Sequence, residues 1–309
     1  MKVDKAYCLS KKPLIFAGNG NCIKDLNKEI NSGEMVLLWH PSWNISLKSI
    51  PTLVKTHFMF KKKGNKFIIC CNSKAEYKLC KFFGLDTKLF NQNMHECEHE
   101  FKPVNSQKIY DAFYAAQAKP FKRLQLAKDI KKIYILTYTY GKNAFINDEG
   151  YDLSKLEPLI KHSTWNKSFV HGRDKISKLI CSSHCGLALS KKEGAMWASV
   201  QYLLCGIPLV TTFSKGGRDY FYDDYYVILV KDNSQSVLDG VNLAKNRNYN
   251  PDKIRNKVLQ KMVKHRYEYL DFIIEKFLNK KTDRDKLYDF IWGSEIGIKK
   301  HLHETELNK

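Results

Sequence analysis

The residues best suited to bind a ligand lie between residues 186 and 220. Glu193 and Gly194 follow an apolar run typical of a buried strand, and they open an apolar helical pattern. In a parallel α/β sheet, ligands bind beyond the carboxyl ends of the strands. A carboxylate there can accept hydrogen bonds from two adjacent sugar hydroxyls, and a glycine lets a ligand approach the backbone. The alternative is an acid that complements the dipole of the helix.

A glycine-rich loop follows the next apolar run. Because Gly216 and Gly217 have no side chains, their backbone N–H groups can face an anion, and Lys215 or Arg218 adds positive charge. A flexible turn before an exposed strand is the alternative. Because this loop and Glu193 follow consecutive strands, both are expected at one edge of the sheet.

Lys122 and Arg123 form a basic pair at the start of a helix predicted over residues 121–130. Cations at a helix start are unfavourable for the helix dipole, so their position calls for a compensating anion. A diphosphate leaving group is such an anion. A solvated surface pair is the alternative.

Composition limits the class of protein. The 309 residues exceed a usual single domain and predict two domains. The formal charge of +20 invites a nucleic-acid partner, but the 52 Lys and Arg residues are spread over the whole chain without a nucleic-acid-binding motif. Solvated lysines are the simplest interpretation, followed by attraction to an anionic membrane or acceptor. We therefore expect no specific nucleic acid as partner.

The same sequence predicts a cytoplasmic protein that is peripheral on the inner face of the membrane. It shows no signal peptide and no apolar run long enough to span a bilayer. The nine cysteines are an odd number, and several lie in apolar segments, which favours reduced thiols.

Strand and helix patterns alternate along the chain and predict an α/β fold. We expect an N-terminal Rossmann-like domain over residues 1–108, with a polar interdomain connection at 91–105. A second domain is expected over 109–282, followed by a C-terminal helix and charged tail over 283–309. Strands are expected at 13–18, 35–39, 66–71, 110–116, 133–140, 185–190, 207–213 and 225–231. Helices are expected at 73–83, 121–130, 153–162, 174–182, from 193, at 251–279 and at 283–292.

Residues 186–219 resemble the donor-binding half of GT-B glycosyltransferases, which use nucleotide sugars. The resemblance rests on Glu-Gly opening a helix, on Leu-Leu-Cys-Gly-Ile-Pro-Leu-Val and on Gly-Gly-Arg-Asp. In that family one Glu contacts the donor sugar and a second, eight residues on, contacts the ribose. Glu193 matches the first position, and Gln201 stands at the second, which keeps hydrogen bonding but loses the charge.

The resemblance implies two Rossmann-like domains that face each other across a cleft, with the terminal helix crossing back to the first domain. It implies that Lys122 and Arg123 face the donor diphosphate and that Gly194, Gly216, Gly217 and Arg218 belong to the donor site. It also implies a hexosyltransferase-like enzyme without metal or cofactor. Its acceptor would be a carbohydrate or a lipid-linked saccharide in surface polysaccharide synthesis.

The first domain would supply the acceptor side. His40, at the end of a predicted strand, is the candidate general base because its unperturbed pKa suits proton transfer near neutral pH. The turn formed by Gly18, Asn19 and Gly20 is the candidate acceptor contact. A structural histidine and a plain strand-to-helix turn are the alternatives.

Two patterns resemble metal sites but are given no metal. His95 and His99 match the zinc-protease spacing His-Glu-x-x-His, but they lie in a polar segment before Pro103 and lack a third ligand. Cys181, His184 and Cys185 lack a fourth ligand.

The sequence therefore predicts a glycosyltransferase. The rival is a non-catalytic carbohydrate- or nucleic-acid-binding protein, which Gln201 favours.

Overall fold

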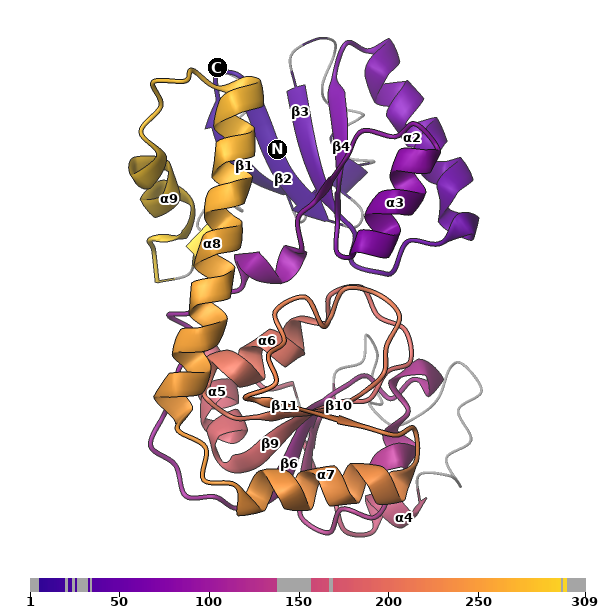
Figure 1. The fold of residues 1–309 in the computed structure, drawn as a ribbon, viewed down its shortest axis with the longest axis vertical. Coiled ribbons are helices and arrows are strands. Elements are labelled where there is room, and N and C mark those ends of the chain that lie inside the picture. Colours follow the sequence, from indigo (N-terminus) through magenta and orange to yellow (C-terminus); the bar gives the residue numbers. More distant parts are fainter. Residues whose placement is uncertain are drawn as a thin grey trace. The chain divides into compact units, whose positions relative to one another are not determined.

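The computed structural model describes residues 6–19, 22–23, 26, 33, 35–137, 157–166, 169–295 and 297–298. The chain divides into two compact units (Figure 1). Unit 1 takes its described residues from 1–99, 216–220 and 261–309, and unit 2 takes them from 100–215 and 221–260. These limits differ from the expected boundaries after residues 108 and 282, because the chain leaves unit 1 at residue 99 and returns to it within a long helix.

Unit 1 is built on a five-stranded sheet in the order β1-β2-β3-β4-β5. Its strands are β1 (Ala6–Lys11), β2 (Leu14–Asn19), β3 (Met35–His40), β4 (Lys66–Cys71) and β5 (Thr87–Leu89). Strand β1 pairs antiparallel with β2, and the other neighbours are parallel. Helices α2 (Ile50–Lys62) and α3 (Lys74–Phe82) connect the strands, with 3₁₀ turns at Leu47–Ser49 and Gln92–His95.

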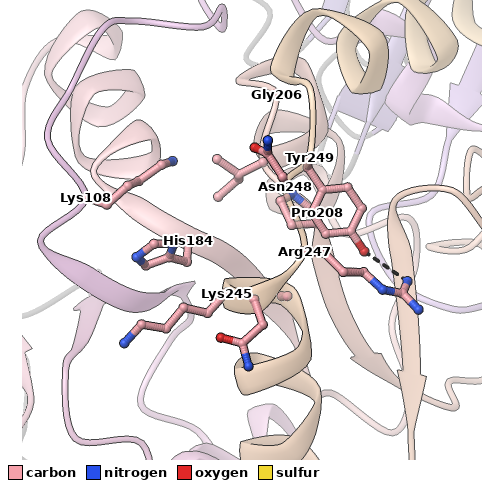
Figure 2. A pocket seen from close by; sticks show the side chains of 11 residues that line it. Lys108, His184, Gly206, Pro208, Lys245, Arg247, Asn248 and Tyr249 are labelled. Carbon is pink, nitrogen blue, oxygen red and sulfur yellow. Dashed lines mark hydrogen bonds between the residues drawn. The ribbon is translucent and has the colours of Figure 1, made fainter.

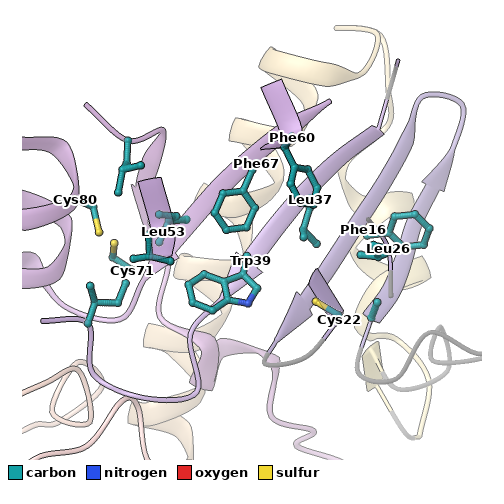
Figure 3. Close-up of a cluster of buried hydrophobic side chains, with 14 of the residues drawn as sticks. Phe16, Cys22, Leu26, Leu37, Trp39, Leu53, Phe60, Phe67, Cys71 and Cys80 are labelled. Carbon is teal, nitrogen blue, oxygen red and sulfur yellow. The ribbon is translucent and has the colours of Figure 1, made fainter. Parts of the chain in front are cut away.

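The core of unit 1 forms between the sheet and its helices. Figure 3 shows Trp39, Phe60 and Phe67 grouped there, with ring centroids 5.8 Å apart for Trp39–Phe67 and 5.2 Å for Phe60–Phe67. These three side chains are almost fully buried, and aromatic burial of this kind dominates core energetics. Strand β3 is buried along its whole length, which explains its uninterrupted apolar sequence.

Unit 2 contains a six-stranded parallel sheet in the order β11-β10-β9-β6-β7-β8. Its strands are β6 (Tyr110–Ala115), β7 (Ile133–Leu136), β8 (Thr164–Trp165), β9 (Ser183–Ala188), β10 (Leu209–Thr212) and β11 (Val227–Val230). Its helices are α4 (Glu157–Ile160), α5 (Arg173–Cys181), α6 (Trp197–Leu204) and α7 (Ser234–Asn246), with 3₁₀ turns at Pro120–Lys122 and Leu124–Ala127.

Helices α6 and α7 cover opposite faces of this sheet. A Cβ on Gly186 of β9 would meet the ring of Tyr202 in α6, and a Cβ on Gly240 of α7 would meet Val210 of β10. Val210 is in register with the residue after Gly186, and successive residues of a strand point to opposite faces. Both glycines are therefore required for close helix–sheet packing.

The C-terminal part of the chain consists of α8 (Pro251–Phe277) and α9 (Arg284–Trp292). Residues 261–298 belong to unit 1, where Arg266 of α8 donates to the hydroxyl of Tyr288 in α9. Within the described chain, no helix is long and apolar enough to cross a membrane. All nine cysteines belong to the described residues, and all are free thiols.

Two expected helices differ from the structure in ways that affect the site. Residues 121–130 form two 3₁₀ turns rather than an α-helix, because Arg123 between them adopts the left-handed conformation with φ 52°. Helix α6 begins at Trp197, not at Glu193, after Met196 with φ 53°. Glu193 and Gly194 therefore lie in the loop between β9 and α6. The part of the expected strand beyond Thr137 and of the expected helix before Glu157 lies outside the described residues.

Candidate functional site at the carboxyl edge of the second sheet

The carboxyl edge of the sheet in unit 2 brings Glu193 and Lys122 together. The ammonium of Lys122 donates to Oε1 of Glu193, and the hydroxyl of Ser190 donates to the same oxygen at 2.7 Å. Both charged side chains are about nine-tenths buried. Oε2 of Glu193 accepts no hydrogen bond from a described residue. The carboxylate is thus held by one oxygen and has the other available for a ligand donor.

Two loops are joined to position this carboxylate. Lys192, after β9, forms a parallel bridge with Lys215, after β10. The N–H of Glu193 donates to the carbonyl of Lys215 at 3.0 Å, and the N–H of Lys215 donates to the carbonyl of Lys191 at 2.9 Å. These backbone bonds extend the pairing of β9 and β10 past the strand ends and fix where the Glu193 side chain emerges.

Arg123 binds the ends of the neighbouring strands. Its Nε donates to the carbonyl of Leu189 at 2.5 Å, one terminal nitrogen donates to Oγ1 of Thr212 at 2.6 Å, and the other pairs with Asp232 at 2.8 Å. Hydrogen bonding to Arg123 lowers the pKa of Asp232. The left-handed backbone of Arg123 delivers its guanidinium to these three groups. They occupy much of its donor capacity, which favours a positioning role over direct contact with phosphate.

Two further residues predicted for the donor site, Gly194 and Gln201, lie in unit 2 without a contact that assigns them a role. Gly194 is buried in the loop before α6, and Gln201 is half-buried within α6. Helix α6 follows this loop and has no side-chain cap at its N-terminus. The contact of Gln201 with a ribose stays a prediction.

Gly216, Gly217 and Arg218 belong to unit 1. A Cβ on Gly217 would come within 2.2 Å of the carbonyl oxygen of Asn72, and the Gly217 carbonyl accepts from Nδ2 of Asn91 at 2.6 Å. Arg218 is only 2% exposed. The structure therefore explains Gly217 by close packing within unit 1, while Lys215, directly before Gly216, is bonded through its backbone to Glu193. The contact of Gly216, Gly217 and Arg218 with a donor stays a prediction.

His40 lies in a buried cluster of unit 1, at the end of β3. The indole of Trp292 donates to Nδ1 of His95 at 3.3 Å, so His95 in its neutral form donates from Nε2 to Nε2 of His40, also 3.3 Å away. The hydroxyl of Tyr269 lies 3.5 Å from the same His40 nitrogen. In the neutral imidazole of His40, the N–H is therefore at Nδ1.

This environment speaks against His40 as a general base. Its side chain is 3% exposed, and burial, together with the charge of His265, lowers the pKa of His40 to about 3. Burial and the neighbouring His40 likewise hold the pKa of His95 well below its ordinary value. A base with so low a pKa has little driving force to take a proton near neutral pH. The prediction from sequence is replaced here by a structural role.

The predicted acceptor turn begins at the same sheet edge. Asn19 is in register with His40, and Gly18 is in register with Trp39. Oδ1 of Asn19 is buried and has no hydrogen-bond partner among the described residues, which makes it a candidate for binding a hydroxyl. Gly20 lies outside the described residues.

The first part of the segment expected to be a polar connector, residues 91–97, is in fact buried, whereas residues 102, 104 and 105 are exposed. Asn91 binds the carbonyl of Asn72 at 2.9 Å, Asn72 accepts from the N–H of Gln92 at 3.0 Å, and the N–H of Asn91 donates to His265 at 3.0 Å. Polar groups of residues 91 and 92 thus bind other protein groups rather than solvent. No group of three potential metal ligands exists among the described residues, in this segment or around Cys181.

Sequence reasoning missed Ser190, Thr212 and Asp232, which support the charged pair and Arg123. Ser190 and Thr212 lie at the carboxyl ends of predicted strands, and Asp232 directly follows one. A search for polar side chains at and just beyond the carboxyl ends of strands would have found them.

Two units built on parallel sheets are the architecture of the GT-B fold of nucleotide-sugar glycosyltransferases, and comparison with solved structures confirms that fold. Anabaena HepE, crystallised with UDP and glucose, is similar with a TM-score of 0.61 and 13% identity, over 82% of this chain and 80% of that chain. Sucrose-phosphate synthase of Thermosynechococcus elongatus gives a TM-score of 0.56 and 12% identity, over 86% and 73%. AviGT4, a glycosyltransferase involved in avilamycin A biosynthesis, gives 0.56 and 11%, over 84% and 78%. No protein-family model and no curated protein matches the sequence.

Proposed function

We propose that this protein transfers a sugar from a nucleotide-sugar donor to a carbohydrate or lipid-linked saccharide acceptor. The observation that carries the proposal is the nearly buried pair of Lys122 and Glu193 at the carboxyl edge of the parallel sheet in unit 2. In a parallel α/β sheet this edge is where ligands bind. The GT-B fold of HepE, which holds UDP and glucose at a similar architecture, supports a nucleotide-sugar ligand.

Each partner of the pair suits one part of such a donor. The free Oε2 of Glu193 would accept from the hydroxyls of the sugar, while Oε1 stays with Ser190. The ammonium of Lys122 would turn toward the diphosphate and stabilise the negative charge that develops as the glycosyl bond breaks. We propose that this side chain takes the charge-neutralising role that a divalent cation has in other transferases. Arg123 keeps both loops in place.

Differential scanning fluorimetry against UDP-, GDP-, ADP- and CMP-sugars tests donor binding, and hydrolysis of the stabilising donor tests chemistry. We expect one nucleotide class to raise the melting temperature and Glu193→Ala to abolish transfer while the protein stays folded. Glu275→Ala, an exposed acid on α8, is the matched control. Normal transfer by Glu193→Ala would show that the site is misplaced.

The rival function is a non-catalytic carbohydrate- or nucleic-acid-binding protein on the same fold. Gln201, in place of a second acid, is the feature that favours it. Absence of stabilisation by every nucleotide sugar, together with tight and salt-sensitive RNA binding, would support the rival and contradict the transferase.

We further propose that unit 1 rests on an anionic membrane surface that carries the acceptor. Phe82 is 82% exposed at the end of α3, its neighbour Phe83 is also exposed, and Lys78 and Lys81 precede them. Exposed aromatic rings beside lysines suit the interface of an anionic bilayer. Sedimentation with phosphatidylglycerol vesicles should fall when Phe82 and Phe83 are replaced by serine. Undiminished sedimentation would contradict this surface.

A further inference from the structure

A cavity lies at the amino-terminal edge of the sheet in unit 2, opposite the edge that holds Glu193 (Figure 2). It has a volume of about 310 Å³ and includes His184, at the start of β9, in its wall. Its lining is Lys108, His184, Gly206, Ile207, Pro208, Ala244, Lys245, Asn246, Arg247, Asn248 and Tyr249. None of these residues is acidic. Strand β9 separates the cavity from Ser190 and Glu193 by roughly 20 Å, since six residues rise about 3.3 Å each.

The cations of this cavity are only partly neutralised by the described chain. The ammonium of Lys108 donates to the carbonyls of Cys181 at 2.9 Å and Ser183 at 2.7 Å but meets no carboxylate. Arg247 donates to the hydroxyl of Tyr249 at 3.3 Å and likewise has no carboxylate partner among the described residues.

Lys245 is the one lining cation with an acidic partner in the described chain. Its ammonium pairs with Asp111 at 2.7 Å. Three cations less one carboxylate leave an excess of two positive charges around the cavity. His184 adds none near neutral pH, because burial and the charges of Lys108 and Lys245 lower its pKa. It offers a neutral hydrogen-bonding ring instead.

We infer that this cavity is a phosphate-binding site, separate from the donor site, that takes a small phosphate ester such as a sugar phosphate. A phosphate monoester carries close to two negative charges at neutral pH and presents three acceptor oxygens. The guanidinium of Arg247 and the remaining N–H of Lys108 are the donors that such oxygens prefer. Figure 2 shows Lys108, His184 and Lys245 on one side of the space and Arg247 on the other, where its guanidinium is directed to the hydroxyl of Tyr249 and would turn inward to reach a bound phosphate.

The neutral part of the lining suits the rest of an ester. The side-chain amides of Asn246 and Asn248 make no hydrogen bond with a described residue, so they are available to sugar hydroxyls. Pro208 and Tyr249 add apolar surface on which a sugar ring can pack. The cavity is at the small end of ligand sites, which fits a monosaccharide phosphate better than a nucleotide sugar.

Isothermal titration calorimetry on the whole protein with glucose 6-phosphate, inorganic phosphate and glucose tests this site. We expect glucose 6-phosphate to bind more tightly than inorganic phosphate and glucose not to bind. Arg247→Gln and Lys108→Gln should each weaken the ester about tenfold or more, the usual effect of losing a charged hydrogen bond. Lys175→Gln, an exposed lysine of α5, is the matched control and should leave binding unchanged.

The same titrations separate this site from the donor site. Lys122→Met should retain the binding of glucose 6-phosphate. Equal affinity for phosphate and its ester supports the site and assigns free phosphate as the ligand. Failure of both anions to bind would overturn the proposal, as would binding that Lys122→Met abolishes and Arg247→Gln leaves intact. Arg247 lies on the surface, so that variant should fold even if Lys108→Gln does not.

Discussion

The carboxyl edges of the two sheets use polar residues in opposite ways. At the edge in unit 1, Asn72, Asn91, His40 and His95 are buried, and their hydrogen bonds go to other groups of the same unit. At the edge in unit 2, Lys122 and Glu193 pair through a single carboxylate oxygen and leave the other open. The difference teaches that a polar strand end becomes a ligand site only where its groups keep unused hydrogen-bonding capacity. By that criterion Asn19, whose Oδ1 is buried without a partner, is the acceptor prediction that fits best among the described residues of unit 1.

The largest effect is expected where a charge pair of unit 1 is broken. Arg266 is fully buried, and its guanidinium forms two 2.7 Å bonds to Glu98 besides bonds to the carbonyls of Met94 and Glu96. Burial opposes the ionisation of Glu98. The hydrogen bonds and the charge of Arg266 nevertheless keep the pKa of Glu98 below its ordinary value. Glu98→Gln leaves a buried cation uncompensated and should lower the free energy of unfolding by about 3–5 kcal/mol.

Denaturant unfolding followed by circular dichroism measures this change. The exposed Glu275→Gln, with the same loss of charge, should stay within about 0.5 kcal/mol of the wild type. If Glu98→Gln were as stable as this control, the prediction would be wrong. The edge in unit 1 would then tolerate an unpaired charge, as an open binding site does.

The second effect concerns the edge in unit 2 and is functional. Lys122→Met removes the cation expected to face the diphosphate, so nucleotide affinity should fall about 10- to 150-fold, the equivalent of a charged hydrogen bond. Titration calorimetry with the stabilising nucleotide measures it, with Lys191→Met, an exposed lysine of the loop that carries Glu193, as control. Equal affinities for both variants would place the nucleotide elsewhere.

The third effect is a pH dependence of stability at the buried histidines of unit 1. His40 has a pKa of about 3 when folded and an ordinary value near 6.5 when unfolded, so the unfolded chain binds more protons between these values. Stability is therefore complete above pH 6.5 and falls as the pH is lowered. From pH 8 to pH 5 His40 alone should account for roughly 2 kcal/mol, and His95 adds to it.

Urea titrations at several pH values check this slope. His40→Asn should flatten the profile by about its own share, whereas His171→Asn, at an exposed histidine, should leave the slope unchanged. If His40→Asn and the wild type lose stability in parallel on acidification, His40 is not buried in its neutral form and regains its candidacy as a base.

Local sequence predicted the parts of the fold that depend on local patterns. The apolar runs of β3 and β4 gave strands within one residue of those observed, since fully buried parallel strands need such runs. The apolar periodicity of residues 121–130 was misleading, because Arg123 takes a left-handed conformation to reach the ends of strands far away in sequence.

The candidate site was predictable in part for the same reason. Glu193 and Lys122 could be found from strand ends and residue type, but their pairing over 71 positions could not. The burial of His95 was equally hidden, because a segment rich in Asn, His and Glu has the composition of an exposed loop. Only its long-range partners, such as Trp292, make it part of a core.

The smallest effect is expected at the second arginine–carboxylate pair, which sharpens the contrast with Glu98. Asp232 is 44% exposed, and Arg123 keeps its bonds to Leu189 and Thr212 without it. Asp232→Asn should therefore lower the free energy of unfolding by less than about 1 kcal/mol at neutral pH, as exposed ion pairs do. The pKa of Asp232 is lowered in the folded protein, so even this contribution is present at neutral pH and lost as the pH falls into the acidic range. Denaturant unfolding at pH 7 and pH 3 measures both points. A cost comparable to that of Glu98→Gln would show that the Arg123 cluster is as closed to solvent as the core of unit 1, and would remove the basis for distinguishing the two edges.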